Sequence, residues 1–347
     1  MQIQIERLEN RDDSELTEFL DGLGKRSPSV LGYHYPIYRD VIAAAGAGEA
    51  CTLAARVDGK LRAVLPAFRK ITPEGAVFGS LPFFGPNAGV LAGEDQAGEL
   101  QTALLRSLIE DARAAGAVAC SVYTPFLASD FASYDSVMPD ALVTDKFTQY
   151  LDLETVTFSK SIAYDLRRSE RLGVTVSTDV DAQRRDAFYG LYVQNCIEQG
   201  IPVKPRACVE MLLDLEALGR RSAVYFAFHD GEMIGGLLVL RSPMTVSYYI
   251  PCTLARARGF QPGTLLIDRA IRDARARGAR YWNWESSPSR ESGVFQFKKK
   301  WGSQEGRYRI YLQPFRSQQY FRDLGRERIA DLFPYYFVYP FDRLREK

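Results

Sequence analysis

Apolar and polar positions follow the same order in the two halves of the chain. In each half, two apolar stretches flank an Asp-Gly pair. The flanks are residues 51–57 and 61–68 around Asp58-Gly59, and residues 223–228 and 233–240 around Asp230-Gly231. A two-residue type I′ turn needs positive φ at both central residues, so Asp-Gly between apolar runs predicts a β-hairpin. We therefore expect one hairpin in each half.

A helix and a further strand follow each hairpin in the pattern. Apolar residues recur at helical spacing over 104–115 and 265–277, and Gly116 and Gly278 stand at the expected helix ends. Strand-like residues follow at 118–123 and 280–285. A strand that leads through a helix into a parallel strand needs a crossover, which predicts a mixed sheet flanked by helices. The fold class is therefore α/β with a mixed sheet.

The repeat predicts a domain duplication. We place the first domain at residues 1–153, the second at 154–313, and an aromatic and basic tail at 314–347. A basic segment at 160–171 opens the second domain, and helical patterns follow at 182–199 and 205–218.

Charge differs strongly between the two halves, although the net charge of the 347 residues is only +1. Residues 1–155 carry 13 Lys and Arg against 22 Asp and Glu, and residues 156–347 carry 31 against 21. This asymmetry predicts either a phosphate-bearing partner of the second half or attraction between the halves.

Several classes of protein are disfavoured. The first 13 residues lack the apolar core of a signal peptide, and no apolar run approaches the roughly 20 residues of a membrane span. Five scattered cysteines without a C-x-x-C pair argue against disulfides and zinc. We expect a cytoplasmic protein without a metal, with peripheral binding to the inner face of the membrane as an alternative.

Two segments of the second half carry a resemblance to a known family. Residues 281–285 read YWNWE, and residues 293–302 read GVFQFKKKWG. Together with RRSERLGV at 167–174 and GIPVKP at 200–205, they resemble the Fem-type proteins, FemA, FemB and FemX-like, and most of all the members encoded near exopolysaccharide genes. The resemblance spans about residues 30–310.

The resemblance implies two tandem domains of GCN5-related N-acetyltransferase (GNAT) fold, the acyl-CoA N-acyltransferase fold. It also implies transfer of an acyl or aminoacyl group to an amine of an amino sugar, an amino acid or a cell-envelope or polysaccharide precursor. The donor would be acyl-CoA, another acyl thioester or aminoacyl-tRNA.

A loop before the second helix is the expected donor site. GNAT domains hold the pyrophosphate of coenzyme A in a loop that reads [QR]-x-x-G-x-[GA], and Arg256 and Gly259 fit this pattern. Gln261 replaces the final small residue and Pro262 removes an N–H donor, which departs from ordinary coenzyme A binding. Arg256 and Arg258 can still contact a phosphate, and the alternative is a solvated loop.

Candidate catalytic residues lie at the end of strand 280–285 and in the family segment. The resemblance suggests that Phe297 and Lys298 lie at the donor or acceptor site, where Lys298 would stabilise the negative charge on the attacked carbonyl oxygen. Glu285 would accept the proton of the amine or orient it, and Asn283 is a weaker candidate. Tyr249 would donate to the leaving group, although Tyr248 is an equal choice.

Two further regions are candidates for binding. Arg167, Arg168 and Arg171 open the second domain, and in Fem-like proteins basic residues of this region help to hold sugar-nucleotide phosphates. The tail at 333–341 is dense in aromatic residues and flanked by arginines, which suits either a membrane interface or packing onto the second domain.

The residues favour direct attack of an amine on an activated carbonyl, because no G-x-S-x-G elbow and no cysteine or histidine cluster is present. Two other hypotheses stay open. The chain can be a non-catalytic nucleotide- or RNA-binding module that keeps the fold, or a structural partner in a polysaccharide assembly complex.

Overall fold

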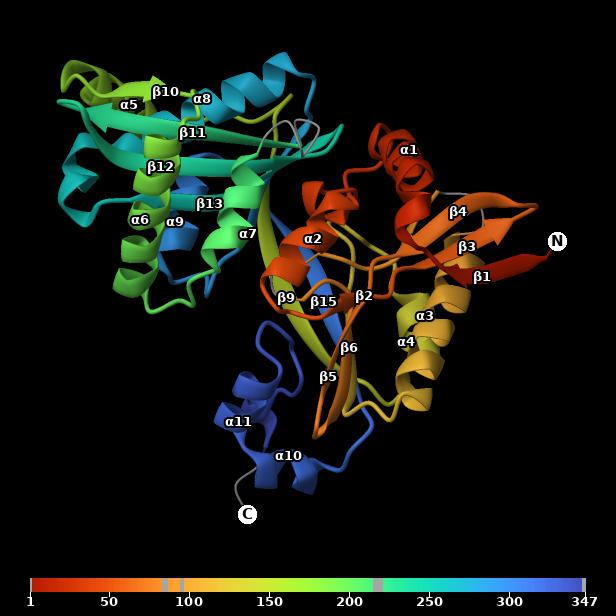
Figure 1. The fold of residues 1–347 in the computed structure, drawn as a ribbon. Coiled ribbons are helices and arrows are strands. Elements are labelled where there is room, and N and C mark those ends of the chain that lie inside the picture. Colours follow the sequence, from red (N-terminus) through yellow and green to blue (C-terminus); the bar gives the residue numbers. More distant parts are fainter. Residues whose placement is uncertain (1, 83–86, 94–96, 215–220, 345–347) are drawn as a thin grey trace. The chain divides into compact units, whose positions relative to one another are not determined.

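The computed structural model describes residues 2–82, 87–93, 97–214 and 221–344. The chain forms two compact units (Figure 1). Unit 1 combines Met1–Lys146 with Arg307–Lys347, and unit 2 is the continuous stretch Phe147–Gly306. Two long strands, β9 (Leu142–Asp152) and β15 (Gln304–Pro314), carry residues of both units.

The other elements divide between the units as follows. Unit 1 holds β1 (Ile3–Arg7), α1 (Asp13–Gly24), α2 (Ile37–Ala44), β2 (Glu49–Ala50), β3 (Leu53–Val57), β4 (Lys60–Leu65), β5 (Phe68–Thr72), β6 (Gly75–Gly79), β7 (Leu91–Ala92), α3 (Ala97–Ala114), β8 (Ala119–Tyr123), α4 (Ala132–Val137), α10 (Gln318–Leu324) and α11 (Arg326–Leu332). Unit 2 holds α5 (Lys160–Arg171), β10 (Thr175–Ser177), α6 (Ala182–Gln199), α7 (Arg206–Leu213), β11 (Ser222–His229), β12 (Glu232–Arg241), β13 (Thr245–Thr253), α8 (Pro262–Ala276), β14 (Tyr281–Ser286) and α9 (Gly293–Lys300).

Each unit contains the predicted crossover. In unit 1 the strands β6 and β8 pair in parallel and α3 connects them, and in unit 2 α8 connects the parallel strands β13 and β14. The remaining pairs are antiparallel in the sheet β10-β11-β12-β13-β14-β9 of unit 2. The predicted mixed sheets are therefore confirmed.

Both predicted hairpins are present with the expected backbone geometry. Asp58 and Gly59 have φ of 51° and 75°, and Asp230 and Gly231 have φ of 49° and 79°. The two turns join β3 to β4 and β11 to β12 as antiparallel pairs. Positive φ at both central residues is the geometry of the type I′ turn that the Asp-Gly pairs predict.

The two copies differ in where the hairpin lies. In unit 2 the hairpin belongs to the same sheet as the crossover strands, whereas in unit 1 it belongs to a separate sheet of order β1-β3-β4-β7. Pro66 follows β4 directly, and β5 begins at Phe68 in the other sheet. Proline lacks the N–H that a central strand would donate, so the pairing ends at this residue.

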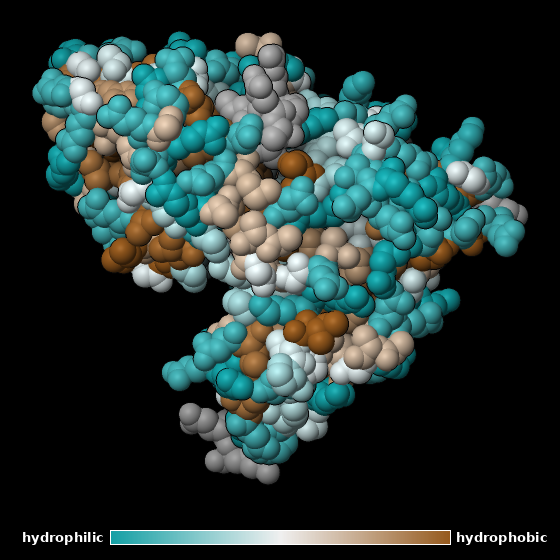
Figure 2. Space-filling view, in the orientation of Figure 1, coloured by the Kyte–Doolittle hydropathy of each residue, from teal (hydrophilic) through white to brown (hydrophobic). Residues whose placement is uncertain are grey.

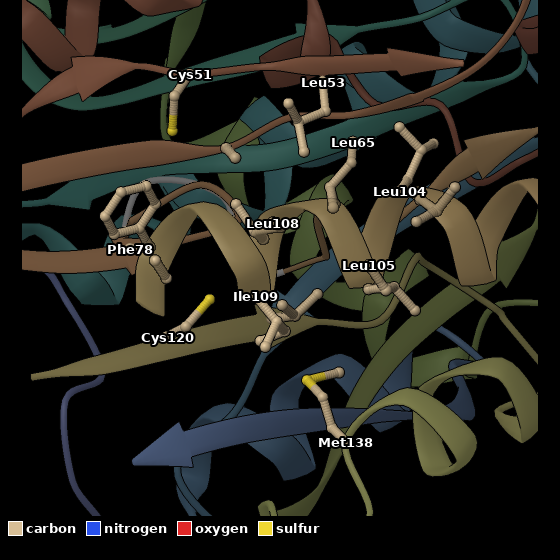
Figure 3. Packing of buried hydrophobic residues seen from close by; sticks show 14 of the residues in the cluster. Cys51, Leu53, Leu65, Phe78, Leu104, Leu105, Leu108, Ile109, Cys120 and Met138 are labelled. Atoms are coloured by element: carbon tan, nitrogen blue, oxygen red, sulfur yellow. The ribbon is translucent and has the colours of Figure 1, made fainter. Parts of the chain in front are cut away.

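The core of unit 1 lies around α3 (Figure 3). Leu104, Leu105 and Leu108 are at most 1% exposed, and they pack among apolar residues of β3, β4, β6 and β8. The polar face of α1 is exposed and accounts for hydrophilic surface in Figure 2.

The tail packs within unit 1, against residues of both its amino-terminal stretch and β15. Phe321, Ile329, Phe333 and Val338 are at most 4% exposed and form a cluster with residues of β6, β8 and β15. These side chains cover apolar residues that the sheet of unit 1 would otherwise expose. Residues 307–313, which the sequence assigns to the second domain, and the tail at 314–347 both belong to unit 1.

Helices cover both faces of the sheet of unit 2. A Cβ atom on Gly236 would lie 2.5 Å from the Phe188 ring of α6, whereas one on Gly235 would lie 3.3 Å from Leu266 of α8. The neighbouring glycines therefore face opposite helices, and Gly236 is needed because any larger residue would clash with Phe188. The predicted helix at 182–199 is α6, whereas the second begins at Arg206, and residues 215–218 of that prediction lie outside the described residues.

Candidate active site

A bulge at the end of β14 places Glu285. The pairing of β14 with β9 shifts register between Asn283 and Ser286, and Glu285 has a φ of 57°. This left-handed conformation costs a non-glycine residue about 1–2 kcal/mol. Within the described part of the chain, β13 and β14 pair only from Thr245–Tyr281 to Ser247–Asn283. Glu285 thus lies just beyond the point where the two parallel strands stop pairing.

Asn283 and Ser247 contact the Glu285 carboxyl, and one of its two oxygens has no hydrogen-bond partner among the described residues. Asn283 Nδ2 donates to Oε1 over 2.8 Å, and the backbone N–H of Glu285 donates to Asn283 Oδ1 over 2.9 Å. The second oxygen, Oε2, is buried and has no hydrogen-bond partner among the described residues. Burial raises the pKa of Glu285 to about 7, against the opposing effects of a Ser247 hydrogen bond and the Lys298 charge.

Asn283 is fully buried and bonded through both ends of its amide. Besides Glu285, it donates to Ser247 Oγ over 3.3 Å and accepts from Thr148 Oγ1 over 3.2 Å. The predicted site residue Asn283 therefore connects three strands and holds the Glu285 carboxyl in one orientation.

Lys298 of α9 is 3% exposed and donates to the bulge itself. Its Nζ lies 3.0 Å from the carbonyl oxygen of Ser286, 2.9 Å from Ser287 Oγ and 3.4 Å from the carbonyl oxygen of Glu285. These three acceptors match the three hydrogens of an ammonium group. Burial lowers the pKa of Lys298 to about 8, while the Glu285 charge opposes this shift. A bond from Lys298 to a substrate oxyanion would require the exchange of one of these three bonds.

Three neutral residues that the sequence analysis missed complete this cluster. Ser287 Oγ donates to Gln149 Oε1 over 2.9 Å, and Gln149 Nε2 donates to Ser303 Oγ over 2.9 Å. Gln149 is fully buried on β9, between the buried Thr148 and the half-buried Tyr150. A buried amide is retained only where its hydrogen bonds are satisfied, so Gln149 owes its place on β9 to these partners. No pattern in the sequence indicated this residue.

Two other predicted residues, Tyr249 and Phe297, lie on β13 and α9. Tyr249 lies where β13 shifts register against β12, and Lys204 Nζ lies 5.5 Å from its ring centre. Phe297 is half-buried, and its ring packs against Trp284 and Trp301 at centroid distances of 6.5 and 6.4 Å.

The predicted phosphate-binding loop forms a 3-10 helix, Ala255–Phe260, directly before α8. Arg256 and Arg258 are both exposed, and carboxylates already face them: Arg256 forms a two-bond ion pair with Glu232, and Arg258 lies 3.9 Å from Glu198. No described residue has an atom within 4 Å of a Cβ placed on Gly259. A phosphate at this loop would therefore compete with two carboxylates for the arginines.

The predicted phosphate-binding arginines at the start of the second domain lie on α5, which packs against α8. Arg167, Arg168 and Arg171 are exposed. Arg167 and Arg171 share a face with Tyr164 and Glu170, where they line an open hollow of about 380 Å³. In the described part of the chain no hydrogen bond or ion pair joins these arginines to the cluster at Glu285. Glu285, Asn283 and Lys298 are the predicted residues that the structure brings together.

None of the helices among the described residues is both long and apolar enough to cross a membrane. Likewise, the described residues contain no group of three or more His, Cys, Asp or Glu side chains placed to hold a metal ion.

Comparisons with known proteins agree with this architecture. Residues 157–284 match the family described as "Acetyltransferase (GNAT) domain". A search of curated proteins found no match. Among solved structures, FemX superimposes with a TM-score of 0.69 at 14% identity, over 88% of this chain and 96% of FemX.

Two further structures are similar over the whole length of their chains. The C-terminal domain of a putative lysylphosphatidylglycerol synthetase from Agrobacterium fabrum gives a TM-score of 0.60 at 14% identity, over 92% of this chain and 96% of that domain. A tandem GNAT protein from the clavulanic acid biosynthesis pathway gives a TM-score of 0.52 at 16% identity, over 91% of this chain and 100% of that protein. The chain therefore has a Fem-like GNAT fold, and the residues that match the GNAT family lie in its second unit.

Proposed function

We propose that the chain is an acyltransferase that moves an acyl or aminoacyl group from a thioester or an aminoacyl ester to an amine. One observation carries this proposal. Glu285 has a buried carboxyl with a pKa of about 7, an oxygen without a partner among the described residues, and a place just beyond the last paired residues of β13 and β14. A general base is most effective when its pKa is near the working pH.

The reaction needs one base and a positioned carbonyl. The amine nitrogen attacks the carbonyl carbon of the donor, and its proton passes to the Glu285 carboxylate. The C–S bond of a thioester, or the C–O bond of an aminoacyl ester, then breaks. The leaving thiolate or alkoxide takes up a proton, so the products are an amide and a free thiol or hydroxyl. Positioning of the two reactants contributes the remaining acceleration.

The donor would reach the carboxyl between β13 and β14. Beyond Ser247 and Asn283 the two strands no longer pair in the described structure, although β13 continues to Thr253. This arrangement frees one edge of β13 for an extended donor chain. The loop at Arg256, Arg258 and Gly259 follows this strand directly, so phosphates of the same donor would lie there, in exchange for Glu232 and Glu198.

Similar proteins favour an aminoacyl or acyl donor. FemX, the putative lysylphosphatidylglycerol synthetase and the tandem GNAT protein share the fold of this chain. The shared fold supports acyl or aminoacyl transfer as the general reaction. We propose an amino sugar, an amino acid or a cell-envelope or polysaccharide precursor as acceptor. Acyl-CoA and aminoacyl-tRNA are cytoplasmic donors, which agrees with the expected location.

A donor panel tests this proposal. The full chain is incubated separately with acetyl-CoA, a long-chain acyl-CoA, an acyl carrier protein and aminoacyl-tRNA, and the melting temperature is recorded. A donor at 100 times its Kd stabilises the fold by about 2.7 kcal/mol. The stabilising donor is then assayed for transfer to amines by mass spectrometry, with Glu285→Gln as the matched variant.

Two outcomes decide between an enzyme and a binding module. Transfer that Glu285→Gln abolishes while donor binding persists supports the proposal. Tight donor binding without transfer to any amine, and with no difference between the wild type and Glu285→Gln, would instead identify a non-catalytic binding module.

A further inference from the structure

Lys298 links α9 to the backbone of the bulge through hydrogen bonds. Its Nζ donates toward the carbonyl oxygens of two successive residues, Glu285 and Ser286. Carbonyl oxygens on a bulge have lost their ladder partners, so a buried donor is needed to satisfy them. Lys298 supplies that donor from α9, where it is 3% exposed.

Further hydrogen bonds, which run through Ser287 and Gln149, hold the residue that follows the bulge. Ser287 Oγ accepts from Lys298 and donates to Gln149 Oε1, both over 2.9 Å. Gln149 Nε2 donates in turn to Ser303 Oγ and, over 3.3 Å, to the carbonyl oxygen of Phe295 in α9. The turn after Glu285 is therefore fixed to α9 through Lys298 and, independently, through Gln149.

We infer that Lys298 and Gln149 are positioning residues that hold Glu285 in its left-handed conformation and aim its carboxyl at the amine. This inference rests on the proposed role of Glu285 as the base. It differs from the expectation that Lys298 stabilises the oxyanion, because all three ammonium hydrogens already have protein acceptors. Lys298 thus acts on the reaction through Glu285, and Gln149 acts through Ser287.

The surroundings of Glu285 make this role measurable. Its neighbours are Ser247 on β13, Asn283 on β14 and Lys298 on α9, and Thr148 on β9 contacts it through Asn283. Lys298 is the one charged group among them. Replacing it by methionine removes a nearby positive charge, so the carboxyl should ionise at a higher pH.

The first test is structural and uses the full chain. Crystal structures are compared for the wild type, Lys298→Met, Gln149→Leu and Lys300→Met. Lys300 lies on the same helix and is exposed, so it serves as the matched control. We expect Glu285 to leave its left-handed conformation in both Lys298→Met and Gln149→Leu, and to keep it in Lys300→Met. Should Gln149→Leu fail to fold, Ser287→Ala removes the same link with a smaller change.

The second test is an infrared titration of the Glu285 carboxyl, with Glu285→Gln as the reference for subtraction. The midpoint should lie near pH 7 in the wild type and in Lys300→Met, and at a clearly higher pH in Lys298→Met. With an identified donor, the acidic limb of the pH profile of kcat/KM should shift in the same direction.

These measurements separate the two roles of Lys298. If Lys298→Met leaves both the Glu285 conformation and its titration unchanged, while transfer falls by about 100-fold or more, Lys298 acts on the substrate and the inference is wrong. If no donor is ever transferred, the proposed function fails, but the crystal structures and the titration still decide whether Lys298 and Gln149 position Glu285.

Discussion

The two crossovers of this protein have the same topology, two parallel strands joined by a helix, and differ at the end of one strand. The last parallel pair is Gly79–Ser121 in unit 1 and Ser247–Asn283 in unit 2. Two residues further along, unit 1 has Tyr123 and unit 2 has Glu285. In unit 1, β8 stays in register with β15 through Tyr123, whereas β14 shifts register before Ser286.

The chemistry at these equivalent positions differs accordingly. Tyr123 is 8% exposed, and burial raises the pKa of its hydroxyl, so the side chain stays neutral. Its backbone N–H donates to Ser80 Oγ over 2.9 Å. Glu285 instead has positive φ and a carboxyl that ionises near neutral pH. A regular strand end thus suits a scaffold, while a bulge with a buried acid suits a reactive site.

The largest expected effect is on the transfer rate. Glu285→Gln keeps the size of the side chain but removes the base, so kcat/KM should fall by about 10²- to 10⁴-fold. The control is Tyr123→Phe at the equivalent position of unit 1, which should leave the rate unchanged. Steady-state kinetics with the donor from the panel measure both, and an equal loss in the two variants would remove the distinction between the units.

The same substitution should stabilise the fold at neutral and alkaline pH. The pKa of Glu285 rises from 4.5 to about 7 on folding, so the wild type loses about 3 kcal/mol of stability as pH rises from 4.5 through 7. Glutamine does not titrate. Urea unfolding at pH 4.5 and pH 8 should show Glu285→Gln gaining over the wild type only at pH 8, and Tyr123→Phe should show no such pH dependence.

A smaller effect concerns the exposed arginines of α5. If the donor is aminoacyl-tRNA, replacing Arg167 and Arg171 by glutamine should weaken binding and reduce the salt slope of log Kd by about 1 to 2. Arg106 is an exposed arginine on α3 of unit 1, and Arg106→Gln should leave the slope unchanged. Filter binding across a range of salt concentrations gives the three slopes. Equal slopes for all three proteins would exclude α5 as the contact.

The smallest effect should be the same in both units. Gly59→Ala and Gly231→Ala introduce a side chain at φ of 75° and 79°, where the described structure leaves the space within 4 Å of the new Cβ open. Each should cost about 1 kcal/mol, from backbone conformation alone. Urea unfolding measures both. A loss several times larger in one unit would show that the two hairpins do not serve the same structural role.

The frame of the fold could be predicted because its determinants are local. Asp58-Gly59 and Asp230-Gly231 specify their turns by the φ values they tolerate, and Gly116 and Gly278, with φ of 64° and 79°, mark the ends of α3 and α8. Such preferences need no knowledge of the rest of the chain.

The hydrogen bonds of the site could not be predicted from local sequence patterns, because they join residues that are far apart along the chain. Glu285, Asn283 and Lys298 were predicted from strand position and resemblance, and the structure joins them by contacts. Gln149 lies 138 residues from its partner Ser287, and no pattern around either residue indicates the other. Likewise, the packing of the tail depends on apolar side chains of β6 and β8, far away along the chain.

The division of unit 1 into two stretches has a consequence for synthesis. Its first 146 residues leave the ribosome long before β15, α10 and α11, which cover Val77 and Val118. During synthesis, the apolar surface of the amino-terminal stretch of unit 1 therefore stays exposed until residues 307–347 have been made. A fragment cut at residue 153 should aggregate, whereas the uninterrupted stretch 147–306 is the better choice for expression in isolation.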